Sequence, residues 1–124
     1  MSDRPMTVRL PLTSRNALVE VSSRTCRSQS MLLNECIADL AHAFILDEHV
    51  FDPYMHTRDC TSRVSLITSA ASATTLQHLS QLSARKPGVI ARVGWLRWLN
   101  LHGVDEIARW YGAVRPGVDV ERSA

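Results

Sequence analysis

Four side chains that can bind an anion or a nucleobase lie at the polar positions of two predicted strands. Thr7 and Arg9 alternate with apolar residues in the first strand, and Arg63 and Ser65 do so in the second. A guanidinium group donates paired hydrogen bonds, which suits a phosphate or the edge of a guanine base. The alternation therefore predicts a polar strand face that can contact a polyanion.

A second group of candidates lies at two predicted helix-helix turns. Arg27, Ser28 and Ser30 belong to the first turn and the helix after it, and Arg85 and Lys86 fall at the same point of a second segment. Serine near a helix start can cap free backbone N–H groups, and the same helix end favours a bound phosphate. We therefore predict phosphate contacts at both turns.

The distribution of charge along the chain favours a polyanionic partner. Residues 4–34 carry five arginines and one glutamate, residues 35–62 carry six acids and one arginine, and residues 63–104 carry five cations and no acid. Two basic segments separated by an acidic connector are expected when both present one face to a polyanion.

No pattern typical of a catalytic or cofactor site occurs. The chain lacks GxSxG, HExxH and P-loop motifs and paired carboxylates, so we predict no enzyme activity and no cofactor. His42, His49 and His56 recur every seven residues, but the turn signal Asp52-Pro53 breaks the helix that would align them, so we predict no metal site. Three cysteines without CxxC spacing make a disulfide framework improbable.

The first of the elements that must position these candidates is a predicted strand from Met6 to Leu10. Its apolar face includes Val8, and Pro11 ends it. Two helices follow, and their predicted caps are Thr13 or Ser14 for the first and Ser28 for the second. Apolar residues at helical spacing form one stripe on each helix. These stripes consist of Ala17, Leu18, Val21 and Ser22, and of Leu32, Leu33, Cys36, Ile37, Leu40 and Ala41.

The pattern of strand, helix, turn and helix returns after a connector at residues 45–62, in which Ile45, Val50, Phe51 and Tyr54 are expected to pack on the domain. An offset of 58 positions aligns the helices and places Ala84 on Cys26. The strand at residues 63–68 aligns better at an offset of 56, which predicts two extra residues between strand and helix in the second copy.

The second copy is predicted to end in a buried helix at residues 89–101, with Pro87 at the first helical position before it. Trp95 and Trp98 could stack nucleobases, but aromatic residues in an apolar helix favour a core position. Gly103 is predicted to end this helix. A further helix at residues 105–114 is expected to turn Ile107, Trp110 and Tyr111 inward, before a turn at Pro116-Gly117 and a polar tail.

These elements define the predicted organisation, a single domain over residues 1–124. It comprises repeats at 6–44 and 63–102, the connector at 45–62 and a C-terminal helix and tail at 103–124. No apolar run approaches the ~20 residues that span a bilayer, and the N-terminus lacks the layout of a signal peptide. We therefore expect a cytoplasmic protein without membrane contacts.

The first thirty or so positions of this pattern resemble the ribbon-helix-helix family of DNA-binding proteins, of the MetJ/Arc type. The resemblance implies an α+β, mostly α fold: a tandem pseudo-dimer in one chain, with a two-stranded antiparallel ribbon, four helices and an extra C-terminal helix. It further implies that Val8 and Leu10 face the core, that Thr7 and Arg9 face bases, and that the Arg27-Ser28-Gln29-Ser30 turn meets the DNA backbone. Cys26 departs from the family, which usually has glycine there.

The function implied by the resemblance is double-stranded DNA binding, with the ribbon in the major groove and the chain acting as a monomer. The tandem arrangement is most similar to the T-DNA transfer-enhancing virulence factors of Agrobacterium. That similarity implies a plasmid DNA-processing accessory factor that assists a relaxase or other DNA-processing proteins.

Two other functions stay open. A transcriptional autoregulator such as an antitoxin would use the same fold, with residues 104–124 as its toxin-binding segment. A protein-interaction module that has lost DNA binding would agree with the apolar Ile67 on the polar face of the second strand.

Overall fold

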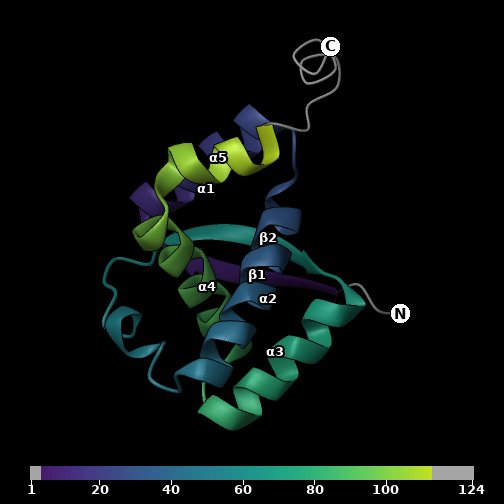
Figure 1. Cartoon of the computed structure of the whole chain (residues 1–124), viewed down its shortest axis with the longest axis vertical. Coiled ribbons are helices and arrows are strands. Elements are labelled where there is room, and N and C mark those ends of the chain that lie inside the picture. The colour runs from purple at the N-terminus through teal and green to yellow at the C-terminus, as the bar shows by residue number, and fades with distance from the viewer. Residues whose placement is uncertain (1–3, 113–124) are drawn as a thin grey trace.

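Two seven-residue strands pair as an antiparallel ribbon across the middle of the molecule (Figure 1). They are β1 (Arg4–Leu10) and β2 (Ser62–Thr68), and Thr7 lies opposite Ser65 in the register. This computed structural model describes residues 4–112. The predicted alternation is confirmed, because one face of the ribbon is buried and the other is exposed. The buried side chains are Val8, Leu10, Val64, Leu66 and Thr68, and the exposed ones include Thr7, Arg9, Arg63, Ser65 and Ile67.

Each strand is followed by two helices. β1 leads into α1 (Leu12–Thr25) and α2 (Gln29–Leu46), and β2 leads into α3 (Ala70–Ser83) and α4 (Pro87–Leu101). The fold is therefore a small α+β structure, mostly α-helical, in which the same order of elements occurs twice. Figure 1 shows α1 and α5 near one end of the molecule and α3 at the other.

A single offset of 58 residues relates the starts of β1 and β2, of α1 and α3, and of α2 and α4. The predicted offset of 56 for the strands, with two extra residues before the helix, is therefore wrong. One residue separates strand from helix in both halves, Pro11 in the first and Ser69 in the second. The sequence could not distinguish the two offsets, because side chains alternate with a period of two and either offset keeps apolar residues on one face.

The two helix-helix turns have the same conformation and the same hydrogen bonds. Cys26 and Ala84 both have φ of 58°, in the left-handed region where glycine is usual. The Ser22 hydroxyl donates to the carbonyl of Arg27 at 2.6 Å, and Ser80 donates to that of Arg85 at 2.6 Å. A non-glycine residue thus occupies the glycine position in each turn.

The helix starts differ from one another. Ser28 caps α2 as predicted, its hydroxyl accepting from the Met31 N–H at 3.0 Å. Neither Thr13 nor Ser14 caps α1, because β1 runs into the helix after Pro11 alone, and the buried Ser14 hydroxyl donates back to the Pro11 carbonyl at 2.9 Å. Pro87 is the first residue of α4, as predicted.

The core lies between the buried face of the ribbon and the helices, with α2 crossing α4. At this crossing Gly94 lies against Cys36, where an added Cβ would come within 3.2 Å of the Cys36 carbonyl oxygen. Trp95 is fully buried and its indole N–H donates to the Ser14 carbonyl at 2.8 Å. Together with the buried Trp98, this confirms a core position for both tryptophans.

The connector contributes fewer core residues than expected. Phe51 is buried, and Val50 and Tyr54 pack against the core, the latter in a short 3-10 helix at Asp52–Tyr54. The prediction that Ile45 packs on the domain is wrong, since 79% of its accessible surface is exposed. α2 continues through Leu46, and its final turn carries Ile45 away from the buried stripe of the helix.

The C-terminal helix α5 (Gly103–Gly112) packs mainly on α1. Gly103, with φ of +78°, follows directly after the residue that caps α4, so the predicted glycine stop is also the first residue of α5. Ile107 is buried as predicted, but the prediction for Trp110 is wrong, since it is 40% exposed; its ring contacts those of Trp98 and His102, at centroid distances of 5.3 and 4.6 Å. Residues 113–114 of the predicted helix and the Pro116-Gly117 turn lie outside the described residues. Within residues 4–112, no helix is long and apolar enough to cross a membrane.

Candidate nucleic-acid interface

The exposed face of the ribbon holds all four polar strand residues that the sequence singled out. Thr7 faces Ser65 across the two strands, and Arg9 faces Arg63. All four side chains are exposed. Each strand contributes an arginine and a small hydroxyl residue, so the face can donate and accept hydrogen bonds.

A basic cleft of about 390 Å³ opens beside this face. Thr7, Arg9 and Arg63 from the ribbon meet Lys86, the cap residue of α4, and Arg92 within α4, and Gly88 and Val89 complete the lining. The cleft thus brings four cations together, and none of its lining residues is acidic. Cations around one concave surface that no acidic side chain lines attract anions such as phosphate.

Arg92 is the residue that the sequence analysis missed. Its Nη1 donates to the carbonyl of Arg9 at 3.5 Å, while its buried Nε has no hydrogen-bond partner within the described part of the chain. Arg92 lies four residues after Gly88, so it shares a helix face with the start of α4. That spacing was the available signal, but only the fold shows that this face turns toward β1.

The start of α4 leaves its backbone donors available. The cap residue Lys86 makes no side-chain cap hydrogen bond, and the Pro87 nitrogen carries no hydrogen. Gly88 lies next to the strand, since an added Cβ there would be in van der Waals contact with the Thr7 carbonyl at 3.4 Å. The free N–H groups of a first helical turn add to the attraction for an anion that the four cations already create.

The start of α2, in the first half, uses its polar groups internally. Besides the Ser28 cap, the Ser30 hydroxyl accepts from the Ile67 N–H at 2.9 Å. Asn34 donates to the Ile67 carbonyl at 3.0 Å and accepts from the Ser69 N–H at 3.3 Å. Two of the predicted phosphate ligands, Ser28 and Ser30, are therefore engaged within the fold.

The two arginine-containing turns have different surroundings. The Arg27 guanidinium lies over the ring of Tyr111, 5.7 Å from its centroid. The Tyr111 hydroxyl donates to Glu35 at 2.5 Å. Partial burial is the larger of the causes that raise the pKa of Tyr111, and this hydrogen bond is the second. Arg85, the residue at the matching position of the second half, is exposed.

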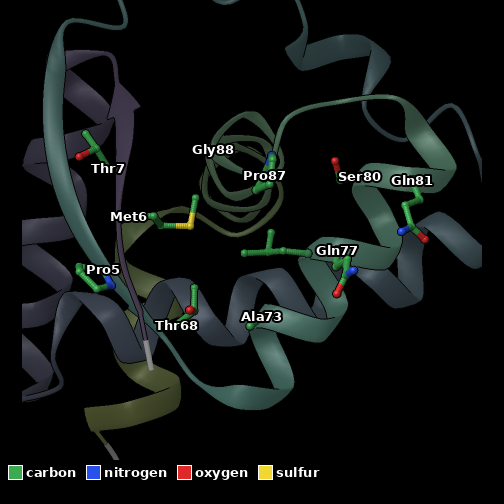
Figure 2. Close-up of a pocket in the computed structure, with 11 residues that line it drawn as sticks. Pro5, Met6, Thr7, Thr68, Ala73, Gln77, Ser80, Gln81, Pro87 and Gly88 are labelled. Carbon is green, nitrogen blue, oxygen red and sulfur yellow. The ribbon is translucent and has the colours of Figure 1, made fainter. Parts of the chain in front are cut away.

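A larger cavity of about 710 Å³ lies on the other side of Thr7 and Gly88, which line both hollows. Figure 2 shows Met6 pointing into it from β1, opposite Gln77 on α3 and beside Pro87 at the start of α4. Its lining is largely apolar and carries no charge, so the anion-binding chemistry belongs to the basic cleft.

The histidines do not gather into a metal site in residues 4–112, where no three His, Cys, Asp or Glu side chains come together suitably. The Nδ1 atom of His49 instead lies 3.3 Å from the carboxylate of Asp52.

No protein-family model, curated protein or solved structure matches the chain.

Proposed function

We propose that the chain binds double-stranded DNA with the exposed face of its ribbon, as a tandem ribbon-helix-helix pseudo-dimer folded from one polypeptide. Two pairs of residues support an internal twofold relation. Thr7 faces Ser65 in the ribbon, and Cys36 meets Gly94 at the helix crossing. In both pairs the partners are 58 residues apart, the offset that relates the two halves. Residues related by a twofold axis meet their own equivalents at that axis.

The observation that carries the DNA-binding proposal is the basic cleft beside the exposed ribbon face. A two-stranded ribbon fits the major groove of B-DNA, where its outward side chains reach base edges. Arg9 and Arg63 lie on this face and also line the cleft. In the proposed complex, Thr7, Ser65 and the two arginines contact bases, while Lys86, Arg92 and the start of α4 hold the adjacent phosphates.

The biological role that we propose is that of an accessory factor in plasmid DNA processing, on the basis of the sequence resemblance to T-DNA transfer-enhancing virulence factors. The candidate protein partner is a relaxase. An autoregulator would bind DNA with the same face, so nicking of a transfer-origin duplex by a relaxase, with and without the chain, separates the two roles.

DNA binding is tested by fluorescence anisotropy with random-sequence duplex DNA over a salt series, comparing wild type with Arg9→Ala and Lys86→Ala. We expect affinity to fall steeply as salt rises, because binding releases counterions, and to be weaker for both variants. Absence of binding at low salt would overturn the proposal and favour the protein-interaction module. Wild-type affinity in both variants would place DNA elsewhere on the surface.

A further inference from the structure

We propose that only the second half of the molecule holds DNA phosphates, so that the chain binds DNA in one orientation on a site without twofold symmetry. This inference rests on the proposed DNA binding. It goes further by assigning the phosphate contacts to the α4 side of the cleft, where Lys86 and Arg92 lie.

Residues at the matching positions of the two halves differ in charge. Every cation of the cleft is replaced by a neutral residue 58 positions away. The pairs are Lys86 and Ser28, Arg92 and Asn34, Arg9 and Ile67, and Arg63 and Pro5. The hollow that attracts anions in one half therefore has no charged counterpart built from these positions in the other.

The neutral counterparts also make hydrogen bonds to the backbone of the facing strand. Asn34 on α2 donates to the Ile67 carbonyl on β2 just as Arg92 on α4 donates to the Arg9 carbonyl on β1, so the same contact between the halves occurs twice. In the first half, however, Ser30 and Asn34 also take the N–H groups of Ile67 and Ser69. Hydrogen-bonding groups that are satisfied within the fold gain little from a phosphate.

The helix α5 removes the remaining symmetry. It follows α4 and packs on α1, where Asp105 accepts from Arg24 at 2.9 Å and Tyr111 lies beneath Arg27. Asp105 adds a carboxylate to the first half, beside Glu20, which pairs with the same arginine at 3.1 Å. By contrast, no ion pair within the described residues involves Arg9, Arg63, Lys86 or Arg92.

The two ends of the ribbon then contact different features of the duplex. At one end, Arg9 can bond a guanine while the cleft beside it holds phosphates. At the other end, Ile67 is 52% exposed on the same face, and an apolar side chain there suits the 5-methyl group of thymine. Each half-site is thus recognised by different chemistry, which fixes the orientation of the chain.

The test compares two variants that remove one positive charge each, Lys86→Ser in the cleft and Arg27→Ser at the first turn. Binding to random duplex DNA is measured over a salt series, and circular dichroism verifies folding. We expect Lys86→Ser to weaken binding by about tenfold and to reduce the salt slope by roughly one, as for a lost phosphate contact. Arg27→Ser should weaken binding less than about threefold with an unchanged slope, because long-range attraction alone is lost.

Equal losses of affinity in the two variants would show that both halves contact phosphates. That result would overturn this inference while leaving DNA binding intact. Failure of the wild-type chain to bind would overturn DNA binding and this inference together. Sequencing of duplexes retained from a random pool adds an independent readout: we expect a motif without twofold symmetry, and a palindromic motif would contradict oriented binding.

Discussion

Cys26 and Ala84, at the two helix-helix turns, have a positive φ without being glycine, as does Asp59 in the connector. Their φ of 58° places a side chain in the left-handed region, which costs roughly 1–2 kcal/mol for most residues. The sequence indicated the turn at Cys26 from the break in apolar spacing, and the turn at Ala84 from the offset of 58 positions between the two copies. The same conformation occurs at the matching position of each half, with the same serine hydrogen bond beside it.

Replacing Cys26 by glycine should stabilise the fold, because glycine adopts positive φ without a steric penalty. After allowing for the extra entropy of glycine in the unfolded chain, we expect Cys26→Gly to raise the free energy of unfolding by about 0.5–1 kcal/mol. Urea denaturation measures the change. Ala84→Gly provides the matched comparison and should give a similar gain, and a loss of stability in both would contradict the assigned conformation.

Asp39 makes the stability sensitive to acid. Its carboxylate accepts from Arg97 at 2.6 Å and from the Trp98 indole at 3.0 Å. Partial burial acts to raise the pKa of Asp39, but the hydrogen bonds from Trp98 and Arg97 outweigh burial and hold the pKa below its ordinary value. A carboxyl group with a lowered pKa in the folded state stabilises the fold above the unfolded-state pKa of about 3.9, and this contribution is lost as the pH falls through the folded-state pKa.

We therefore expect Asp39→Asn to reduce stability at pH 7, by about 1 kcal/mol or less because the side chain is half-exposed to screening solvent. The difference from wild type should shrink as the pH falls below 4 and should be seen in urea denaturation at each pH. Glu48→Gln, at an exposed carboxylate, serves as a control. A difference that is constant between pH 7 and pH 2 would contradict the role of ionised Asp39.

At the scale of elements, the strands, the helix pairs and the two turns could be predicted from apolar spacing alone. The strand offset could not, because a period of two leaves offsets of 56 and 58 equally compatible with one buried face. The exposure of Ile45 and Trp110 was also out of reach, since an apolar residue at a helix end is buried only if another element covers it. The path of the connector and the packing of α5 determine whether these two residues are covered, and both depend on tertiary contacts.

The helix α5 is held to α1 mainly by its apolar face. Ile107 is fully buried, so Ile107→Ala removes contacts and leaves a cavity, which should lower the free energy of unfolding by about 2–4 kcal/mol. Leu101 is 53% exposed, and Leu101→Ala should change stability by less than about 0.5 kcal/mol. Thermal and urea unfolding of both variants check this, and a small effect of Ile107→Ala would argue against the packing of α5 on the domain.

At the scale of the whole molecule, the proposed internal twofold relation depends on the close approach of α2 and α4. An added methyl group at Gly94 would lie 3.2 Å from the backbone carbonyl oxygen of Cys36 and 3.3 Å from its sulfur. The backbone of α2 can give way only by moving the helix. Overpacking of this kind costs typically about 1–3 kcal/mol, more than the gain in helix propensity of roughly 1 kcal/mol.

We accordingly expect Gly94→Ala to be destabilising although the residue is helical. The loss should be smaller in a Cys36→Ala background, where the sulfur contact is absent, and a double-mutant cycle measures this coupling. Additive effects of the two substitutions would assign the clash to the Cys36 backbone alone, and a stabilising effect of Gly94→Ala would contradict the close approach of the helices.

The proposed DNA-binding face was largely foreseeable from the sequence, and its asymmetry only in part. Thr7, Arg9, Arg63 and Lys86 were selected by alternation and turn position, and the structure places all four on one cleft. Arg92 joins them because α4 packs along β1, a contact that local spacing does not specify. The sequence indicated that the two strands differ, but the engagement of Ser30 by the Ile67 backbone appears only in the folded chain.

The most direct test of the central claim is a backbone-amide NMR titration of the full chain with duplex DNA at low salt. The account predicts that the largest shifts occur at Thr7, Arg9, Arg63, Ser65, Gly88 and Val89, and that they diminish as salt is added. Shifts confined to α3 or α5, or none at saturating DNA, would contradict binding through the exposed ribbon face and the basic cleft.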